Sequence, residues 1–75
     1  MNTHRRKRLR EVLKKLEEAK SEVESVRDEE DEARDNMPES LQESDRYSDS
    51  EEASEAMDTA VDNIDEAISA IEEVV

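Results

Sequence analysis

Apolar residues recur at alternating intervals of three and four along two long arms of this sequence, and this repeat constrains the fold more than any other feature. In the first arm, about residues 5–35, the positions are Leu9, Val12, Leu16, Ala19, Val23, Val26 and Ala33. In the second arm, about residues 49–75, they are Ala53, Met57, Ala60, Ile64, Ala67, Ile71 and Val74. A seven-residue repeat of this kind predicts helices that pack lengthwise on other helices.

The second arm is apolar over a wider stripe than one partner helix needs. Val61, Ile68 and Val75 add a third row beside the repeat, and Leu13 widens the stripe of the first arm. A helix with so broad an apolar face contacts more than one neighbour. Only 32% of the 75 residues are apolar, so a single copy buries little core by itself.

We therefore predict an all-α fold in which residues 1–75 form one antiparallel two-helix hairpin with coiled-coil heptads. The hairpin is expected to self-associate into a four-helix or larger bundle. The residues expected in the core of this oligomer are Leu9, Val12, Leu13, Leu16, Val23, Met57, Val61, Ile64, Ile68 and Ile71.

A connector, residues 36–48, separates the two arms and contains the only proline. Asn36 is expected to end the first helix, and Pro38 to start a short helical turn, because proline fits the first position of a helix. Met37 and Leu41 are expected to close the open end of the core. Ser48 has Glu51 three residues later, a pattern that predicts a capping box and a second helix from about residue 49.

Charge is distributed unevenly along the chain, whose formal net charge is −13. The first 15 residues carry seven basic side chains and one acidic one, whereas residues 48–75 carry ten acids and no base. Antiparallel folding is expected to set the basic start against the acidic end of the second arm. The net charge repels nucleic acid and anionic membranes, so no direct duplex DNA binding and no membrane binding are expected. No apolar run reaches the roughly 20 residues that a membrane span needs, and a cytoplasmic protein is expected.

The residues that most catalytic sites require are missing from this sequence. There is no cysteine and no glycine, and the one histidine, His4, lies near the start of the chain. No serine has a histidine partner for a triad, no phosphate-binding glycine loop is possible, and the histidines of a helical di-metal site are absent. We therefore expect no enzyme activity, no metal and no cofactor.

Two sets of polar residues are candidates for binding a ligand or a partner. The first lies in and beside the connector and offers donors, acceptors and the only aromatic ring: Arg27, Arg34, Asn36, Ser40, Gln42, Arg46 and Tyr47. Connectors carry binding residues more often than their scaffolds do, although these residues also fit an ordinary structured loop. The rival is the acidic face of the second arm: Glu51, Glu52, Glu55, Asp58, Asp62, Asp65, Glu66, Glu72 and Glu73.

Three segments, Arg27–Glu30, Asn36–Gln42 and Asp62–Ile68, resemble a group of small acidic helical-hairpin accessory proteins of bacteriophages and prophages, which are largely uncharacterised. Members of that group often have glycine after the connector arginine, where this chain has Tyr47. The resemblance implies a phage accessory role in the cytoplasm of the host cell.

Four functional hypotheses follow, and the sequence leaves them open. The favoured one is a non-enzymatic accessory protein that binds and neutralises a host defence component through an oligomeric helical bundle. In the second, the acidic face mimics DNA and inhibits a nucleic-acid-binding protein. In the third, the bundle is a sponge that sequesters a small anionic nucleotide signal. The last is a purely structural phage protein. The expected partners are thus a second copy of the chain, a host protein and, in the third hypothesis, a small nucleotide.

Overall fold

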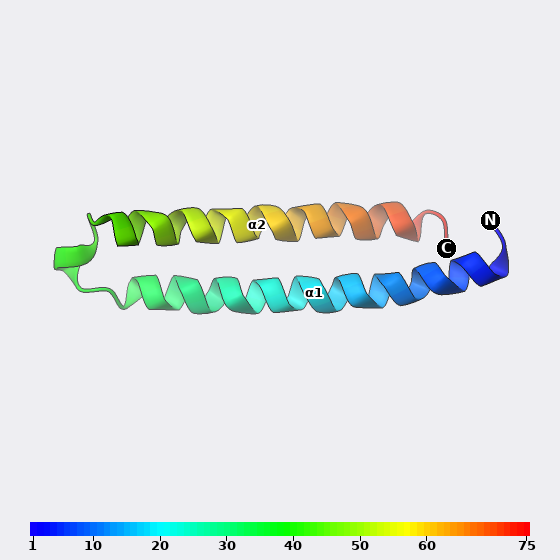
Figure 1. Ribbon diagram of the computed structural model, residues 1–75, viewed down its shortest axis with the longest axis horizontal. Coiled ribbons are helices and arrows are strands. Elements are labelled where there is room, and N and C mark those ends of the chain that lie inside the picture. Colours follow the sequence, from blue (N-terminus) through cyan, green and yellow to red (C-terminus); the bar gives the residue numbers. More distant parts are fainter.

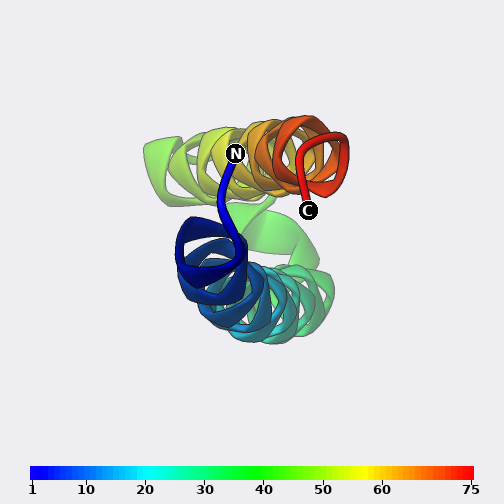
Figure 2. The same cartoon turned by 90° about the vertical axis from the view of Figure 1, so that its right-hand side faces the viewer.

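A computed structural model describes residues 1–75 as two long helices, α1 (Thr3–Asp35) and α2 (Asp45–Glu72), joined through one turn of 3-10 helix, η1 (Glu39–Leu41). The helices lie side by side and run antiparallel, so both termini lie at one end of a rod and the connector lies at the other (Figure 1). The rod measures 59 × 14 × 12 Å. Seen end on, the two helices cross each other at an angle (Figure 2). The predicted all-α antiparallel hairpin is confirmed.

Local hydrogen bonds fix both ends of α1. The side chain of Asn2 accepts a hydrogen bond from the backbone N–H of Arg5 at 2.8 Å, so it satisfies one of the free amides of the first turn. At the other end Asn36 is the last capping residue, and its N–H donates to the carbonyl of Glu32 at 3.1 Å. Asn36 thus ends the first helix, as the sequence predicted.

The start of α2 differs from the prediction by one helical turn. Ser44, rather than Ser48, is the capping residue, and its side chain accepts a hydrogen bond from the N–H of Tyr47 at 3.4 Å. Asp45 then lies in the first turn, where a carboxylate is favoured by the helix dipole. Ser48 lies inside the helix and is exposed. Two serines four residues apart compete for the same role, and the earlier one allows a longer helix.

The seam between the helices keeps one predicted row on each helix, which contains Leu16 and Ile64, but the second row differs from the prediction. The partly or fully buried residues of α1 are Leu9, Leu13, Leu16, Lys20, Val23, Glu24, Arg27, Glu30, Asp31 and Arg34. Those of α2 are Tyr47, Ser50, Ser54, Met57, Ala60, Val61, Ile64, Asp65, Ala67, Ile68 and Ile71. The row of Val12, Ala19, Val26 and Ala33, predicted to lie in the seam, is exposed.

Side-chain size explains which rows of each helix face the other helix. Burying the Val61 and Ile68 row removes more apolar surface from water than burying the alanine row of α2 would, and the gain grows with buried area. On α1 the same rotation buries Leu13 in place of Val12. Even so, Val61 (7% exposed) and Ile68 (6%) are the only buried apolar residues, so the core of one hairpin is thin.

Two further expectations about the ends of the rod are not met. Leu41 does not close the core, because its side chain is exposed; Met37 is half-buried. The basic start of α1 forms no ion pair with α2. Its one ion pair, Lys14 with Glu11, lies within α1 and is exposed. Neither helix contains a segment long and apolar enough to cross a membrane.

Candidate functional site: the polar end of the hairpin

Polar side chains fill the seam near the connector, where the apolar repeat of α1 is interrupted. We call this group the Arg34 cluster, and it consists of Glu30, Asp31, Arg34, Ser50 and Ser54. The first three come from the last turns of α1 and the two serines from the first turns of α2. Ser50 and Ser54 are buried. Because their side chains are small, they leave room for the long side chain of Arg34 between the helices.

The hydrogen bonds of the cluster form a closed network. Arg34 Nη1 donates to Ser54 Oγ at 2.8 Å and to the Ser50 carbonyl at 3.2 Å, and Nη2 donates to Asp31 Oδ1 at 2.8 Å. The Ser54 hydroxyl donates to the same Asp31 oxygen at 2.6 Å, and the Ser50 hydroxyl donates to Glu30 at 2.6 Å. No buried side-chain polar atom lacks a partner. The cluster therefore satisfies itself and leaves no buried donor aimed at a ligand.

Asp31 and Arg34 each stabilise the charged form of the other. The hydroxyl of Ser54, followed by the guanidinium of Arg34, lowers the pKa of Asp31 because both donate to its carboxylate. The hydrogen bond to Asp31 in turn raises the pKa of Arg34. The pair is thus held charged, with Asp31 as carboxylate and Arg34 as guanidinium.

Two further ion pairs continue from the Arg34 cluster along one side of the seam. Arg27 Nη1 lies 2.9 Å from Asp58 Oδ1, and Lys20 Nζ lies 2.8 Å from Asp65 Oδ1. The hydrogen bond that Arg27 donates to Asp58 raises the pKa of Arg27, and the bond that Lys20 donates to Asp65 raises the pKa of Lys20. These pairs lie on the solvent-exposed rim, where screening makes them weak. The two pairs are seven residues apart on each helix, so both pairs specify the same antiparallel register.

A hollow of about 600 Å³, which we call the connector hollow, lies beside the Arg34 cluster. Its lining includes Glu30, Asn36, Met37, Leu41, Arg46 and Asp49. Of the connector residues predicted to bind a ligand, the hollow thus brings together only Asn36 and Arg46. Arg46 is the one cation in the lining, and Glu30 and Asp49 outweigh it, so the hollow does not attract an anion.

The other predicted connector residues lie elsewhere. Ser40 and Gln42 are exposed in and after η1, and Tyr47 is half-buried in the first turn of α2. None of the three lines the connector hollow. Arg27 and Arg34 were predicted to face a ligand, but both donate to side chains of the hairpin itself.

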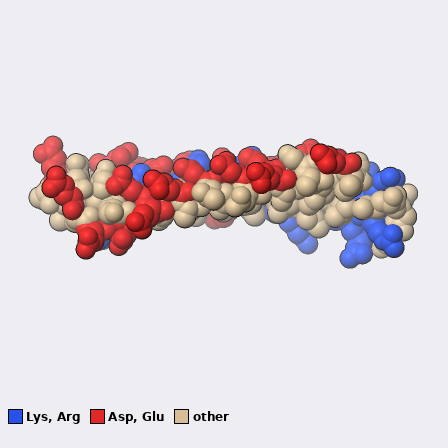
Figure 3. Space-filling model, turned by 90° about the horizontal axis from the view of Figure 1, so that it is seen from above, with Lys and Arg blue, Asp and Glu red and all other residues tan.

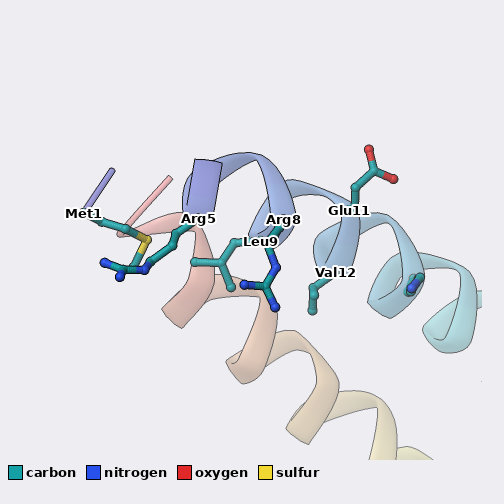
Figure 4. Close-up of a pocket in the computed structure, with 7 residues that line it drawn as sticks. Met1, Arg5, Arg8, Leu9, Glu11 and Val12 are labelled. Carbon is teal, nitrogen blue, oxygen red and sulfur yellow. The ribbon is translucent and has the colours of Figure 1, made fainter. Parts of the chain in front are cut away.

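A second hollow, which we call the terminal hollow, lies at the opposite end of the rod and was not predicted. It measures about 490 Å³, and Arg5, Arg8 and Lys15 surround an apolar floor of Met1, Leu9 and Val12. In Figure 4 the side chains of Arg8, Leu9 and Val12 point to the same side of α1, while Glu11 points away. The signal in the sequence was the spacing of three basic residues, Arg5, Arg8 and Lys15, which lie seven, four and three residues from Val12.

The predicted acidic face is open to solvent along α2. Eight of its nine members are exposed, and the ninth, Asp65, is half-buried beside Lys20. Only five of the 24 acidic residues of the chain take part in an ion pair. Acidic atoms cover the connector end of the rod and much of α2, whereas basic atoms gather at the terminal end (Figure 3). The rod is therefore strongly polarised from one end to the other.

Comparison with protein-family models, with curated proteins and with solved structures gives no match to this chain. Within the chain, no group of three or more histidine, aspartate or glutamate side chains converges as a metal site requires. The geometry thus offers surfaces for recognition: an open acidic face, two hollows and a basic end that forms no ion pair with α2.

Proposed function

We propose that this chain is a non-enzymatic binding protein, a self-associating helical bundle that neutralises a partner protein by occupying the surface with which that partner binds nucleic acid. The observation that carries the proposal is the acidic face of α2, whose carboxylates are exposed and mostly unpaired. The resemblance of the connector to phage accessory proteins makes a protein of the bacterial host the expected partner.

The charge density of the rod supports nucleic-acid mimicry. Duplex DNA carries one negative charge in about 1.7 Å of its axis. Two copies of the hairpin, each with a net charge of −13, would carry one net negative charge in about 2.3 Å if they overlapped along the 59 Å length. A paired rod thus approaches the linear charge density to which a nucleic-acid-binding surface is adapted, while a single hairpin has about half of it.

The acidic face is also rigid, which favours binding through it. Its carboxylates project from one continuous helix, so the backbone that carries them is ordered before a partner arrives and loses little conformational entropy on binding. The connector hollow is a weaker candidate for a binding site. Its lining has no excess of cations, and the nearby Arg27 and Arg34 already have partners, which weighs against sequestration of an anionic nucleotide there.

The test is displacement of host proteins from DNA. Proteins of a bacterial lysate are loaded on immobilised duplex DNA, and the eluted proteins are compared after addition of the wild-type chain or a variant with Glu51, Glu55, Asp62 and Glu66 changed to Gln or Asn. We expect the wild type to release specific nucleic-acid-binding proteins and the variant to release far less. The matched control changes four exposed acids of α1 that lie away from the seam and form no ion pair, Glu17, Glu18, Glu32 and Asp35, to Gln or Asn, and it should retain most of the activity.

Release by neither protein, or equal release by wild type and the α2 variant, would overturn the mimicry proposal. A purely structural role predicts the first of these outcomes.

A further inference from the structure

The exposed large apolar side chains of the hairpin all lie on one side of it. Five are 38–57% exposed, and they are Met1, Val12, Val26, Leu41 and Val74. Val12 and Val26 belong to the α1 row Val12, Ala19, Val26 and Ala33, and Val74 belongs to the α2 row Ala53, Ala60, Ala67 and Val74. Residues seven apart lie along one line of a helix, and antiparallel packing turns both rows to the same side of the seam. We call this side the open face.

The two sides of the seam have opposite characters. The side away from the open face carries the ion pairs Lys20–Asp65 and Arg27–Asp58. The open face carries no ion pair between the helices, and all eight residues in its two rows are valine or alanine, six of them exposed and two, Ala60 and Ala67, half-buried. Both hollows open on it: Val12 lines the terminal hollow, while Ala33 and Ala53 line the connector hollow.

The surface area of the hairpin is too large for a compact monomer. A globular monomer of 8.7 kDa exposes about 4,700 Å² by the usual scaling of area with mass, whereas this chain exposes 5738 Å². The excess is about 1,000 Å², close to the roughly 800 Å² that each partner contributes to a stable protein interface. One further layer of helices on the open face would remove this excess.

We infer that the open face binds a second copy of the chain in antiparallel orientation, so that the terminal end of each hairpin lies on the connector end of the other. In this arrangement α1 packs on α1 and α2 packs on α2 around a two-fold axis, and the four helices form one bundle. The inference rests on the self-association in the proposed function and adds the face, the orientation and the contacting residues.

Side-chain sizes match in this orientation. When Val12 lies opposite Ala33 of the second copy, Ala19 lies opposite Val26 of that copy, so each large side chain of α1 meets a small one. Facing positions that alternate large and small interdigitate best. In the parallel orientation α1 packs on α2 instead, and Val12 meets Val74 while Ala19 meets Ala67, which leaves one contact crowded and the next one empty.

The two helices require the same two-fold axis. The α1 row is centred between Glu22 and Val23, and the α2 row is centred between Asn63 and Ile64. The ion pairs Lys20–Asp65 and Arg27–Asp58 set the relative height of the helices. By that register the two centres lie within about one residue, or about 1.5 Å, of the same height along the rod. A single axis therefore serves both rows.

The hollows and the charges favour the same orientation. The terminal hollow of one copy faces the connector hollow of the other, so Arg5, Arg8 and Lys15 approach a lining that contains Glu30 and Asp49. Parallel packing would instead bring two basic ends together and two acidic ends together. Because each copy has a net charge of −13, repulsion opposes association, and it is weakest when opposite ends overlap.

Single-cysteine variants test the orientation directly, because the chain has no cysteine of its own. Val12→Cys, Ala33→Cys and Val74→Cys are treated singly and in pairwise mixtures with a short bismaleimide crosslinker. We expect a crosslinked dimer in the mixture of Val12→Cys and Ala33→Cys and none from either variant alone, since identical positions lie about 31 Å apart in the antiparallel dimer. Crosslinking of Val12→Cys with Val74→Cys instead would overturn the antiparallel orientation.

A charge swap gives an independent readout. Lys15 falls opposite Glu29 of the second copy, although within one chain the two lie about 21 Å apart. Lys15→Glu should weaken dimerisation about tenfold in analytical ultracentrifugation, and adding Glu29→Lys to the same chain should restore it. A double variant as weak as the single one, or a wild-type chain that stays monomeric, would overturn the inference. The DNA-displacement assay distinguishes the two failures, because a monomer that still releases nucleic-acid-binding proteins refutes only the dimer.

Discussion

The two halves of the hairpin seam are built from different chemistry. In the half next to the termini, the buried and half-buried seam positions are mostly apolar and include Leu9, Leu13, Leu16, Ile68 and Ile71. In the half next to the connector, the same rows of the repeat carry the Arg34 cluster, a closed hydrogen-bond network. Both helices nevertheless run without a break from one half to the other.

This difference shows which half of the seam contributes stability and which half specifies the register of the helices. Apolar burial is roughly proportional to area and has no direction, so the terminal half would tolerate a slip of one heptad at little cost. The connector half tolerates no slip, because Arg34 must meet both serines and Asp31 at hydrogen-bond distance. Polar groups inside a helical seam are best known for specifying register rather than for adding stability. We therefore assign stability to the terminal half and register to the connector half.

Truncation of the apolar half should have the largest effect on stability. Ile68→Ala should lower the free energy of unfolding by about 2 kcal/mol, at the low end for buried isoleucine because a two-helix seam can partly collapse. Urea unfolding followed by circular dichroism measures it at a fixed protein concentration. Ser69→Ala, on the exposed side of the same turn, is the matched control and should change stability by less than about 0.5 kcal/mol. An equal effect of the two variants would contradict the division.

Removal of one hydroxyl from the polar half should cost less. Ser54→Ala deletes a donor to Asp31 and an acceptor for Arg34 in a buried position, and we expect a loss of about 1 kcal/mol in the same assay. Ser48→Ala changes an exposed serine less than two turns earlier in α2 and should be close to neutral. A loss from Ser54→Ala greater than that from Ile68→Ala would reverse the comparison, because the connector half would then carry the stability.

The two halves also differ in how far the sequence predicted them. The seven-residue repeat was enough to predict two antiparallel helices, and Asn36 was enough to end the first. The repeat did not decide which two of three adjacent apolar rows face the partner helix, because Val12 and Leu13 are both apolar and the choice depends on the total area buried by both helices together. The prediction therefore put Val12 inside and left Leu13 at the edge.

The site was predicted less completely than the fold. Arg27 and Arg34 were identified as unusual, but their partners Asp58 and Ser54 come from the other helix, and their distance follows only from the register. Ser54 carried no signal of its own, since a serine in a charged helix is ordinarily exposed. The terminal hollow is formed by three cations and an apolar floor. These side chains are left exposed together only because Leu13, and not Val12, packs in the seam.

The titration of Asp31 should give the smallest and most specific effect, since it reports on the polar half alone. The pKa of Asp31 in the folded state is lowered by Ser54 and Arg34, so its carboxylate contributes stability above the ordinary aspartate pKa of about 3.9, and that contribution is lost as the pH falls through the lowered value. Asp31→Asn should therefore be less stable than its control at pH 7, and the gap should close as the pH falls below about 4.

The control for that titration is Glu66→Gln, which removes the same unit of charge from an exposed position without an ion pair. Removal of any acidic side chain reduces the repulsion within a chain of net charge −13. Because both variants lose one acid, this effect cancels when their stabilities are compared. Thermal unfolding of both variants from pH 7 to pH 3 measures the difference between their stabilities. A difference that stays constant over this range, or one that widens at low pH, would mean that the carboxylate of Asp31 does not hold Arg34 in the seam, and register would then depend on the serines and on the ion pairs of Lys20 and Arg27.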